Sequence, residues 1–191
     1  MHKIIIFISG RGSNMEAIVN ETTSGILKGI AEIVLVFSNN PDAKGLEIAK
    51  AKGLKTHCIV SKGKDRQVYD KEVIEYLKSF QFDCIVLAGY MRILSDAFVC
   101  AYPGRIINIH PADTRLHQGT HAYDWAFKNK MESTLITIHY VNEGVDTGDI
   151  IAQAEVDLKG AQSLQEVEKR GLAVEHKFYP QTLKHLFETL K

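Results

Sequence analysis

The sequence predicts an α/β fold: a doubly wound, mostly parallel, Rossmann-like sheet with an antiparallel C-terminal extension and a long C-terminal helix. The chain opens on a continuous apolar run at 3–8, typical of a strand covered on both faces of a parallel sheet. Apolar runs then alternate with stretches of helical periodicity as far as residue 110. Beyond Pro111 the pattern changes to a polar loop, two neighbouring strand-like runs and one long amphipathic stretch.

The first half is expected to alternate strands with helices. Apolar runs predict strands at 3–8, 31–37, 55–60, 83–88 and 105–109. Helical periodicity and stop signals predict helices at 15–24, 43–53 and 65–80, and a short helix capped by Ser95.

The second half is expected to extend the sheet. A polar loop at 112–120 precedes a predicted helix at 122–130. Strands predicted at 134–141 and 149–156 would form an antiparallel pair. A long helix should begin at Ser163, and Pro180 should kink or break it.

Composition favours a cytoplasmic protein of one domain, residues 1–191, that acts on small molecules. Hydrophobic residues make up 45% of the 191 residues and charged residues 24%. Lys+Arg and Asp+Glu both number 23, and this balance argues against a nucleic-acid or membrane-surface binder. A monomer or a homodimer is expected.

A glycine-rich turn follows the first strand, at Ser9–Asn14. Glycines let the backbone approach an anion, and free N–H groups at the following helix start can hold a phosphate. The turn lacks the GK[ST] ending of a P-loop and the third glycine of the dinucleotide motif. A tight turn without a ligand is the alternative.

Two polar side chains mark the end of the strand at 105–109. Alternate residues share one face of a strand, so Asn108 and His110 project together, and Pro111 ends the ladder. An amide and an imidazole there suit oxyanion stabilisation and proton transfer, although they could simply be a hydrogen-bonded polar pair. Because ligands bind at the carboxyl ends of parallel strands, this pair should share one rim with the turns Ser9–Asn14 and Gly89–Leu94.

Four ordered motifs resemble the glycinamide ribonucleotide formyltransferases, in register over nearly the whole chain. They are Ser9-Gly10-x-Gly12-Ser13-Asn14, Ala88-Gly89-Tyr90-Met91-Arg92-Ile93-Leu94, Asn108-x-His110-Pro111 and Asp146-x-Gly148. The resemblance implies a formyltransferase domain with a nucleotide-binding half, 1–110, and a catalytic and folate-binding half, 111–191. It implies formyl transfer from 10-formyltetrahydrofolate to the amine of glycinamide ribonucleotide in de novo purine biosynthesis, without a metal.

The resemblance also implies site residues. Asn108, His110 and Asp146 would be catalytic, and Glu175 would lie near the ribose of the acceptor. The phosphate would be held by Gly12, Ser13 and Asn14. The folate would contact Arg66, Met91, Arg92, Ile93, Leu94, Asn142 and Asp146.

The chemistry suits the three catalytic residue types. Asn108 offers a donor to the oxyanion that forms when the amine attacks the formyl carbon, and a protonated His110 would add charge. A nearby carboxylate favours the imidazolium, so Asp146 is expected to raise the pKa of His110. Asp146 is also the candidate proton relay, directly or through water.

Several alternatives stay open. By itself Asp146 would be read as a turn aspartate, and His139 as a packed or hydrogen-bonded histidine. The spacing of the histidines fits no standard zinc site. The loop at 112–118 departs from the family, having lost its prolines and gained charges, which leaves the acceptor open. Rivals are a formyltetrahydrofolate hydrolase, a sugar-amine formyltransferase and a non-catalytic folate or ribonucleotide binder; a methionyl-tRNA formyltransferase would need a further domain and a basic surface.

Overall fold

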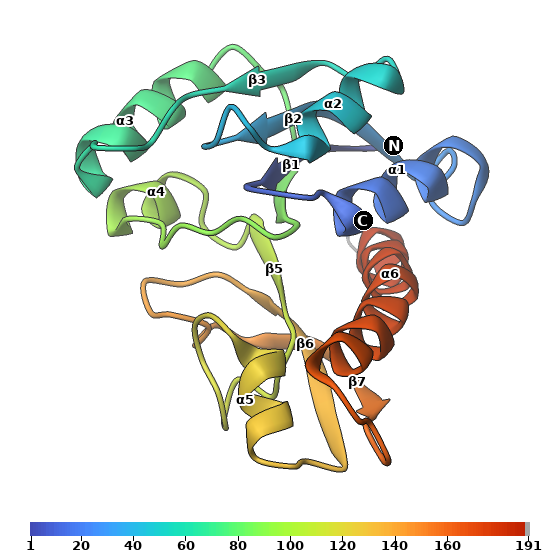
Figure 1. Cartoon of the computed structure of the whole chain (residues 1–191). Helices are drawn as coiled ribbons and strands as arrows, with labels where there is room; N and C mark the ends of the chain where they lie inside the picture. The colour runs from blue at the N-terminus through green and yellow to red at the C-terminus, as the bar shows by residue number, and fades with distance from the viewer. Residues whose placement is uncertain (190–191) are drawn as a thin grey trace.

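The computed structural model describes residues 1–189 and is built on a seven-stranded sheet (Figure 1). The strands are β1 (His2–Ile8), β2 (Ala31–Ser38), β3 (Thr56–Cys58), β4 (Cys84–Leu87), β5 (Ile106–His110), β6 (Ser133–Tyr140) and β7 (Ile150–Asp157). The helices are α1 (Ser13–Ser24), α2 (Lys44–Ala51), α3 (Arg66–Leu77), α4 (Asp96–Ala101), α5 (Ala122–Lys128) and α6 (Leu164–Thr189).

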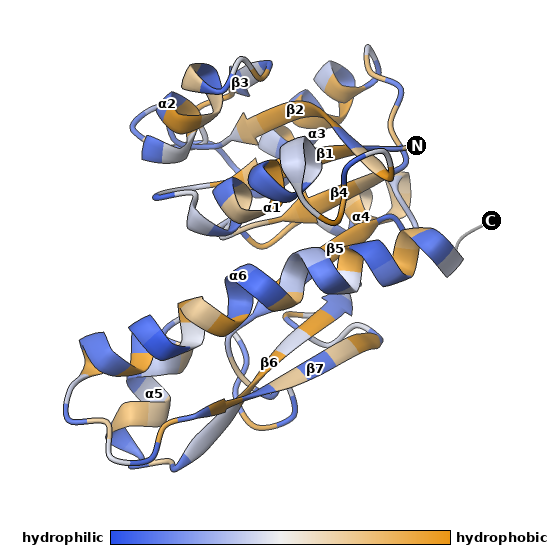
Figure 2. Cartoon of the chain, turned by 90° about the vertical axis from the view of Figure 1, so that its right-hand side faces the viewer, coloured by the Kyte–Doolittle hydropathy of each residue, from blue (hydrophilic) through white to orange (hydrophobic). Residues whose placement is uncertain are grey.

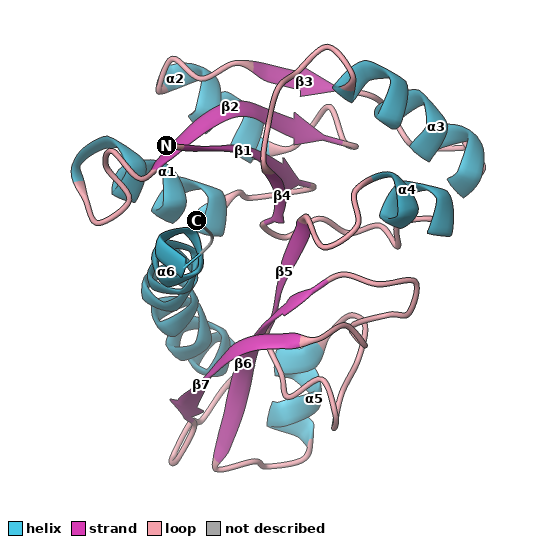
Figure 3. Cartoon of the chain, turned by 180° about the vertical axis from the view of Figure 1, so that it is seen from behind, coloured by secondary structure: helices cyan, strands magenta, loops and turns pink. Residues whose placement is uncertain are grey.

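The strand order is β3-β2-β1-β4-β5-β6-β7. The first five strands run parallel, whereas β6 is antiparallel to β5 and β7 is antiparallel to β6. Figure 3 shows β6 and β7 continuing the sheet beyond β5. The predicted fold class, with its antiparallel extension and long last helix, is confirmed.

Alternation along the strands divides the core into two layers. Ile4, Ile6 and Ile8 of β1 face a cluster that includes residues of α1, α2 and α6. Ile5 and Phe7 face the opposite cluster, which includes residues of α3 and α4. The central strands are hydrophobic along most of their length in Figure 2, as expected of strands that are covered on both faces.

The observed bounds lie within three residues of the predicted ones. The strand predicted at 55–60 is only Thr56–Cys58, because this edge strand pairs with β2 over three residues. None of the helices in residues 1–189 is long and apolar enough to cross a membrane.

Pro180 was predicted to kink or break the last helix, and it does not break it, because α6 continues through it to Thr189. A proline removes one hydrogen bond of the helix, and packing must compensate for that loss. Pro180 is buried, and the neighbouring Tyr179 hydroxyl lies 3.1 Å from the carbonyl oxygens of both Leu87 and Ile107. These contacts anchor α6 to β4 and β5 beside the proline.

Candidate active site

The site lies beside the boundary between β1 and β4. Successive strands are added on one side of β1 as far as β3 and on its other side from β4 onward, so the strand order reverses here. Backbone N–H of Ser9, after β1, donates to the carbonyl of Gly89, after β4, at 3.0 Å. Backbone N–H of Met91 donates to Ser9 Oγ at 2.7 Å. The two turns therefore meet at one rim, as predicted for ligand sites at the switch point of a doubly wound sheet.

A cavity of about 940 Å³ opens beside this rim. Its walls come from the ends of β4, β5 and β6 and from the loops that follow them. The lining includes Asn108 and His110 and every residue predicted to contact folate, namely Arg66, Met91, Arg92, Ile93, Leu94, Asn142 and Asp146.

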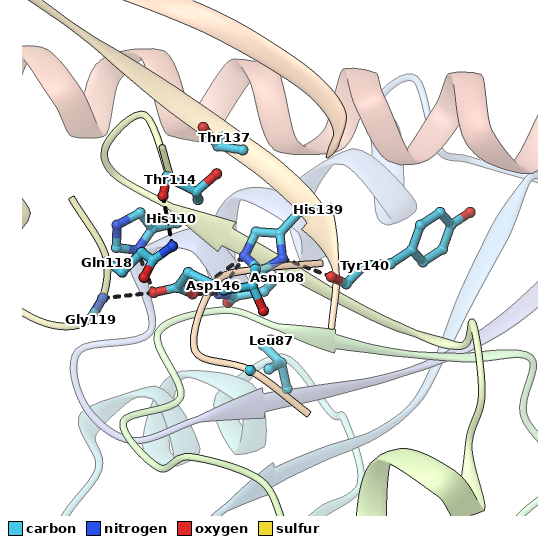
Figure 4. Close-up of polar contacts among 12 residues, drawn as sticks. Leu87, Asn108, His110, Thr114, Gln118, Gly119, Thr137, His139, Tyr140 and Asp146 are labelled. Atoms are coloured by element: carbon cyan, nitrogen blue, oxygen red, sulfur yellow. Dashed lines mark hydrogen bonds and ion pairs between the residues drawn. The ribbon is translucent and has the colours of Figure 1, made fainter. Parts of the chain in front are cut away.

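His110 ends β5 and is only 4% exposed. Its Nδ1 lies 3.3 Å from Oδ2 of Asp146, and its Nε2 lies 3.0 Å from the carbonyl oxygen of His117. Figure 4 shows the imidazole directed at the Asp146 carboxylate. A neutral imidazole has one N–H and can donate to only one of these two oxygen acceptors. A second proton taken up by the ring would donate to the other oxygen.

The prediction that His110 is protonated is wrong, although Asp146 does raise its pKa as expected. Burial lowers the pKa of His110 by more than the Asp146 carboxylate and the His117 carbonyl raise it. The imidazole is therefore uncharged at neutral pH.

Asp146 sits in the loop between β6 and β7 with a left-handed φ of 52°. Its carboxylate accepts the backbone N–H of Gly119 at 2.9 Å and the side-chain amide of Asn108 at 3.2 Å. Burial raises the pKa of Asp146, but the contacts with His139, His110 and the Gly119 N–H together lower it by more. The pKa of Asp146 therefore lies below its ordinary value. Asp146 is thus an anion, held in a backbone conformation that few residues adopt.

His139 joins this group, and residue patterns did not place it there. It is buried and its Nδ1 is 2.8 Å from the carbonyl oxygen of Tyr140, as expected of a packed histidine. Its Nε2, however, lies 3.3 Å from Asn108 Nδ2 and 3.4 Å from Asp146 Oδ1. The contact depends on the antiparallel register that sets Asn108 opposite His139, which periodicity does not reveal.

The predicted phosphate-binding residues begin α1, outside the cavity wall. Gly12 has a φ of 77°, and a Cβ there would lie 2.6 Å from Cα of Gly45, so the turn and α2 pack backbone to backbone. Gly12 has no side chain to cap the helix, which leaves the N–H groups of its first turn open to an anion. The side-chain amide of Asn14 donates to Glu175 at 2.5 Å, so two candidate acceptor-binding residues meet although 161 positions separate them.

The charges of the divergent loop at 112–118 are largely satisfied within it. Asp113 accepts Nε and Nη2 of Arg115 at 2.9 and 2.7 Å, and the side-chain amide of Gln118 donates to the carbonyl of Thr114 at 3.0 Å. The loop ends at Gly119, whose N–H holds Asp146. Its altered sequence therefore still positions the carboxylate.

Comparison with known proteins agrees with this geometry. Residues 2–183 match the formyl transferase family. The chain is similar to the phosphoribosylglycinamide formyltransferase of Escherichia coli, with 39% identity over 93% of this chain and 83% of that protein. It is also similar to the Bacillus subtilis enzyme of the same name, with 37% identity over 97% of this chain and 95% of that protein.

The solved structures point the same way. Phosphoribosylglycinamide formyltransferase from Bacillus halodurans matches this chain with a TM-score of 0.93 and 38% identity, covering 99% of this chain and 97% of that one. Glycinamide ribonucleotide transformylase 1 from Symbiobacterium toebii gives a TM-score of 0.92 at 32% identity, covering 98% of this chain and 88% of that one.

Proposed function

The chain belongs to the formyl transferase family, and we propose that it transfers the formyl group of 10-formyltetrahydrofolate to the amine of glycinamide ribonucleotide, a step of de novo purine biosynthesis. One observation carries the proposal: Asn108, His110 and Asp146 meet in the wall of one large cavity. An amide donor, an imidazole and an ionised carboxylate are the groups that formyl transfer to an amine requires.

The cavity, which we call the donor cleft, fits a flat folate. Its lining is largely apolar and includes the exposed side chains of Met91, Ile93 and Val145. Arg92 supplies a cation, with its guanidinium carbon 4.6 Å from the ring centroid of Tyr69. Within residues 1–189 its buried Nε has no hydrogen-bond partner, as expected of a donor that serves a carboxylate of the ligand.

The second substrate is assigned to a different place, which we call the acceptor junction: Gly12–Asn14, Tyr123 and Glu175, where α1, α5 and α6 meet. The open N–H groups at the start of α1 suit the phosphate of a ribonucleotide. Glu175, buried beside them, would lie near the ribose. In this assignment the first half, 1–110, supplies the phosphate site, and the second half, 111–191, supplies the Asp146 loop. The first half also contributes Arg66 and residues 91–94 to the folate site.

Charge develops on the formyl oxygen when the amine attacks the formyl carbon. The Asn108 amide is the neutral donor for this oxygen, and a donor of this kind contributes on the order of 3 kcal/mol to transition-state stabilisation. Its amide nitrogen lies 3.2 Å from Asp146 and 3.3 Å from His139, and these contacts fix its place in the cleft wall. One of its two N–H groups must leave its present partner to reach the formyl oxygen.

A proton must also pass from the attacking amine to the departing folate nitrogen. His110 is uncharged at neutral pH and can accept that proton, which is then shared between Nδ1 and Asp146 Oδ2. The imidazolium that forms adds a positive charge as the oxyanion appears. Asp146, already ionised, stabilises that charge and can return the proton directly or through water.

Formyl transfer should be measured with 10-formyltetrahydrofolate and glycinamide ribonucleotide, next to a reaction with water as the sole acceptor. We expect N-formylated ribonucleotide and little hydrolysis, and a loss of turnover by about 10²–10³-fold in Asp146→Asn. Asn tolerates the left-handed backbone, so this variant removes the charge and keeps the fold. Release of formate without ribonucleotide product would indicate the hydrolase instead. Transfer to a sugar amine, supplied in a separate reaction, would indicate that rival, and no turnover with any of these acceptors would indicate a binding protein.

A further inference from the structure

Glu175 is held by side chains from two other helices. It lies on α6 and is 4% exposed. Its Oε2 accepts the side-chain amide of Asn14, from the first turn of α1, at 2.5 Å. Its Oε1 accepts the hydroxyl of Tyr123, from the first turn of α5. A buried carboxylate with both oxygens paired is a fixed group, because breaking either contact leaves a buried polar atom unsatisfied.

The Tyr123 ring fills space that a side chain at position 171 would need. Gly171 precedes Glu175 by one helical turn, on the same face of α6. A Cβ at Gly171 would lie 2.1 Å from the Tyr123 hydroxyl oxygen and 2.2 Å from Cζ. Glycine is unfavourable inside a helix, so its presence here is accounted for by the ring that it admits.

The direction of the hydrogen bond between Tyr123 and Glu175 is settled by protonation. Burial, and after it the charge of Glu175, raises the pKa of Tyr123 far above its ordinary value. The phenol therefore keeps its proton at neutral pH. The hydroxyl donates and the carboxylate accepts.

This arrangement also sets the orientation of the Asn14 amide. Because Nδ2 donates to Glu175, the carbonyl end of the amide faces elsewhere. Asn14 is 7% exposed, and in the described part of the chain its Oδ1 has no hydrogen-bond partner. A buried carbonyl oxygen beside the open N–H groups of α1 is suited to accept a hydroxyl from a ligand whose phosphate lies on that helix.

We propose that Tyr123 is a positioning residue for the acceptor substrate: its hydroxyl, admitted by Gly171, fixes Glu175, and Glu175 turns the Asn14 amide so that Oδ1 receives a ribose hydroxyl. The inference rests on the proposed function, since it requires a ribonucleotide at the acceptor junction. Tyr123 itself touches neither the formyl group nor the amine.

The first test is Tyr123→Phe, which removes the hydroxyl and keeps the ring. The KM for glycinamide ribonucleotide should rise about tenfold or more, the range expected when a hydrogen bond to a charged group is lost. The kcat and the KM for 10-formyltetrahydrofolate should stay within about twofold of the wild type. Tyr76→Phe is the matched control, since Tyr76 stacks on His57 at 3.9 Å on the other side of the sheet.

A second variant reaches the same contact from the other helix. Gly171→Ala places a Cβ where the Tyr123 ring lies, and it should raise the acceptor KM as Tyr123→Phe does. The two substitutions together should have no larger effect than either alone, because both act through one hydroxyl–carboxylate contact. Thermal melting shows whether each variant is folded. Additive effects of the two substitutions would overturn the proposed link.

A third readout separates positioning from general loosening of the junction. With the 2′-deoxy and 3′-deoxy analogues of the acceptor, the variant and the wild type should have equal KM for the analogue that lacks the bound hydroxyl. A full Tyr123→Phe effect on both analogues would overturn the inference, and so would an unchanged KM for the natural acceptor. In both cases wild-type formyl transfer still supports the proposed function, whereas an inactive wild type would refute both.

Discussion

The donor cleft and the acceptor junction lie in the same chain and are built in opposite ways. The cleft is an open cavity of about 940 Å³ whose walls are loops after strand ends, with apolar side chains such as Met91 and Ile93 left exposed. The junction has side chains from three helices, among which Asn14 and Glu175 are buried and hydrogen-bonded before any ligand arrives.

This difference indicates two kinds of recognition. Exposed apolar surface binds a large flat ligand through burial, which tolerates small changes of shape. A preformed polar network binds through a few directed hydrogen bonds, which a change of one atom disrupts. Asn108, His110 and Asp146 belong to the cleft wall, yet the proposed function requires them to act on groups from both substrates.

The largest effects are expected from this central group. His110→Ala and Asn108→Ala should each lower kcat by about 10²–10³-fold, with much smaller changes in either KM, because the lost interactions form in the transition state. Steady-state kinetics with each substrate varied in turn measures this. His57→Ala, at the β3 edge, is the matched control and should keep wild-type turnover. A His110 or Asn108 variant with near-wild-type kcat would remove that residue from the proposed chemistry.

The acceptor junction can be broken at its backbone. Gly12→Ala forces a β-carbon into a left-handed residue and against Gly45, at an expected loss of about 1–3 kcal/mol in unfolding free energy. It should raise the acceptor KM much more than the donor KM, because it moves the start of α1. Gly29→Ala is the matched control: Gly29 has a φ of 76° and open space around it within residues 1–189. An equal rise in both KM values for Gly12→Ala would argue that the two regions are not separate sites.

Loss of a cation from the donor cleft should raise the donor KM and leave the acceptor KM unchanged, the reverse of the effect expected for Gly12→Ala. Arg92→Met keeps an apolar side chain over Tyr69 and removes the guanidinium, so the donor KM should rise about tenfold while the acceptor KM stays unchanged. Arg170→Met is the comparison variant, because Arg170 pairs with Glu166 and donates to the carbonyls of Asp157 and Lys159, and none of these contacts lies in the donor cleft. If Arg92→Met left the donor KM unaltered, the folate carboxylate would have to be placed elsewhere.

The same contrast separates what residue patterns could predict from what they could not. Apolar runs placed β1, β4 and β5, and the strand-exit rule placed Asn108 and His110 on one rim with Gly89. These inferences are local, because a strand end and its side-chain alternation are both read from a few consecutive residues.

Contacts that depend on how distant elements meet were beyond those patterns. His139 reaches Asp146 only through strand register, and Asp146 itself pointed to the site only through family resemblance. The Tyr123–Glu175 contact joins residues 52 positions apart on two helices. The protonation of His110 was predicted wrongly because pairing with Asp146 was considered without the cost of burial, which is larger.

The smallest expected effect concerns the burial of His110. The test asks whether the resulting pH dependence of the unfolding free energy comes from the donor cleft and not from the acceptor junction. A histidine with a lowered folded pKa binds a proton more readily when unfolded, so the unfolding free energy should fall as pH drops below the unfolded value, near 6.5. His110→Gln should reduce this fall, measured by urea unfolding at pH 7.5 and 5.5. His57, whose pKa is lowered by burial and by Lys55, contributes to the same slope in both proteins, whereas Asp146 acts only nearer pH 4. Tyr123→Phe, at the acceptor junction, should keep the full wild-type slope. An unchanged slope in His110→Gln would mean that burial does not lower the pKa of His110 in the folded protein.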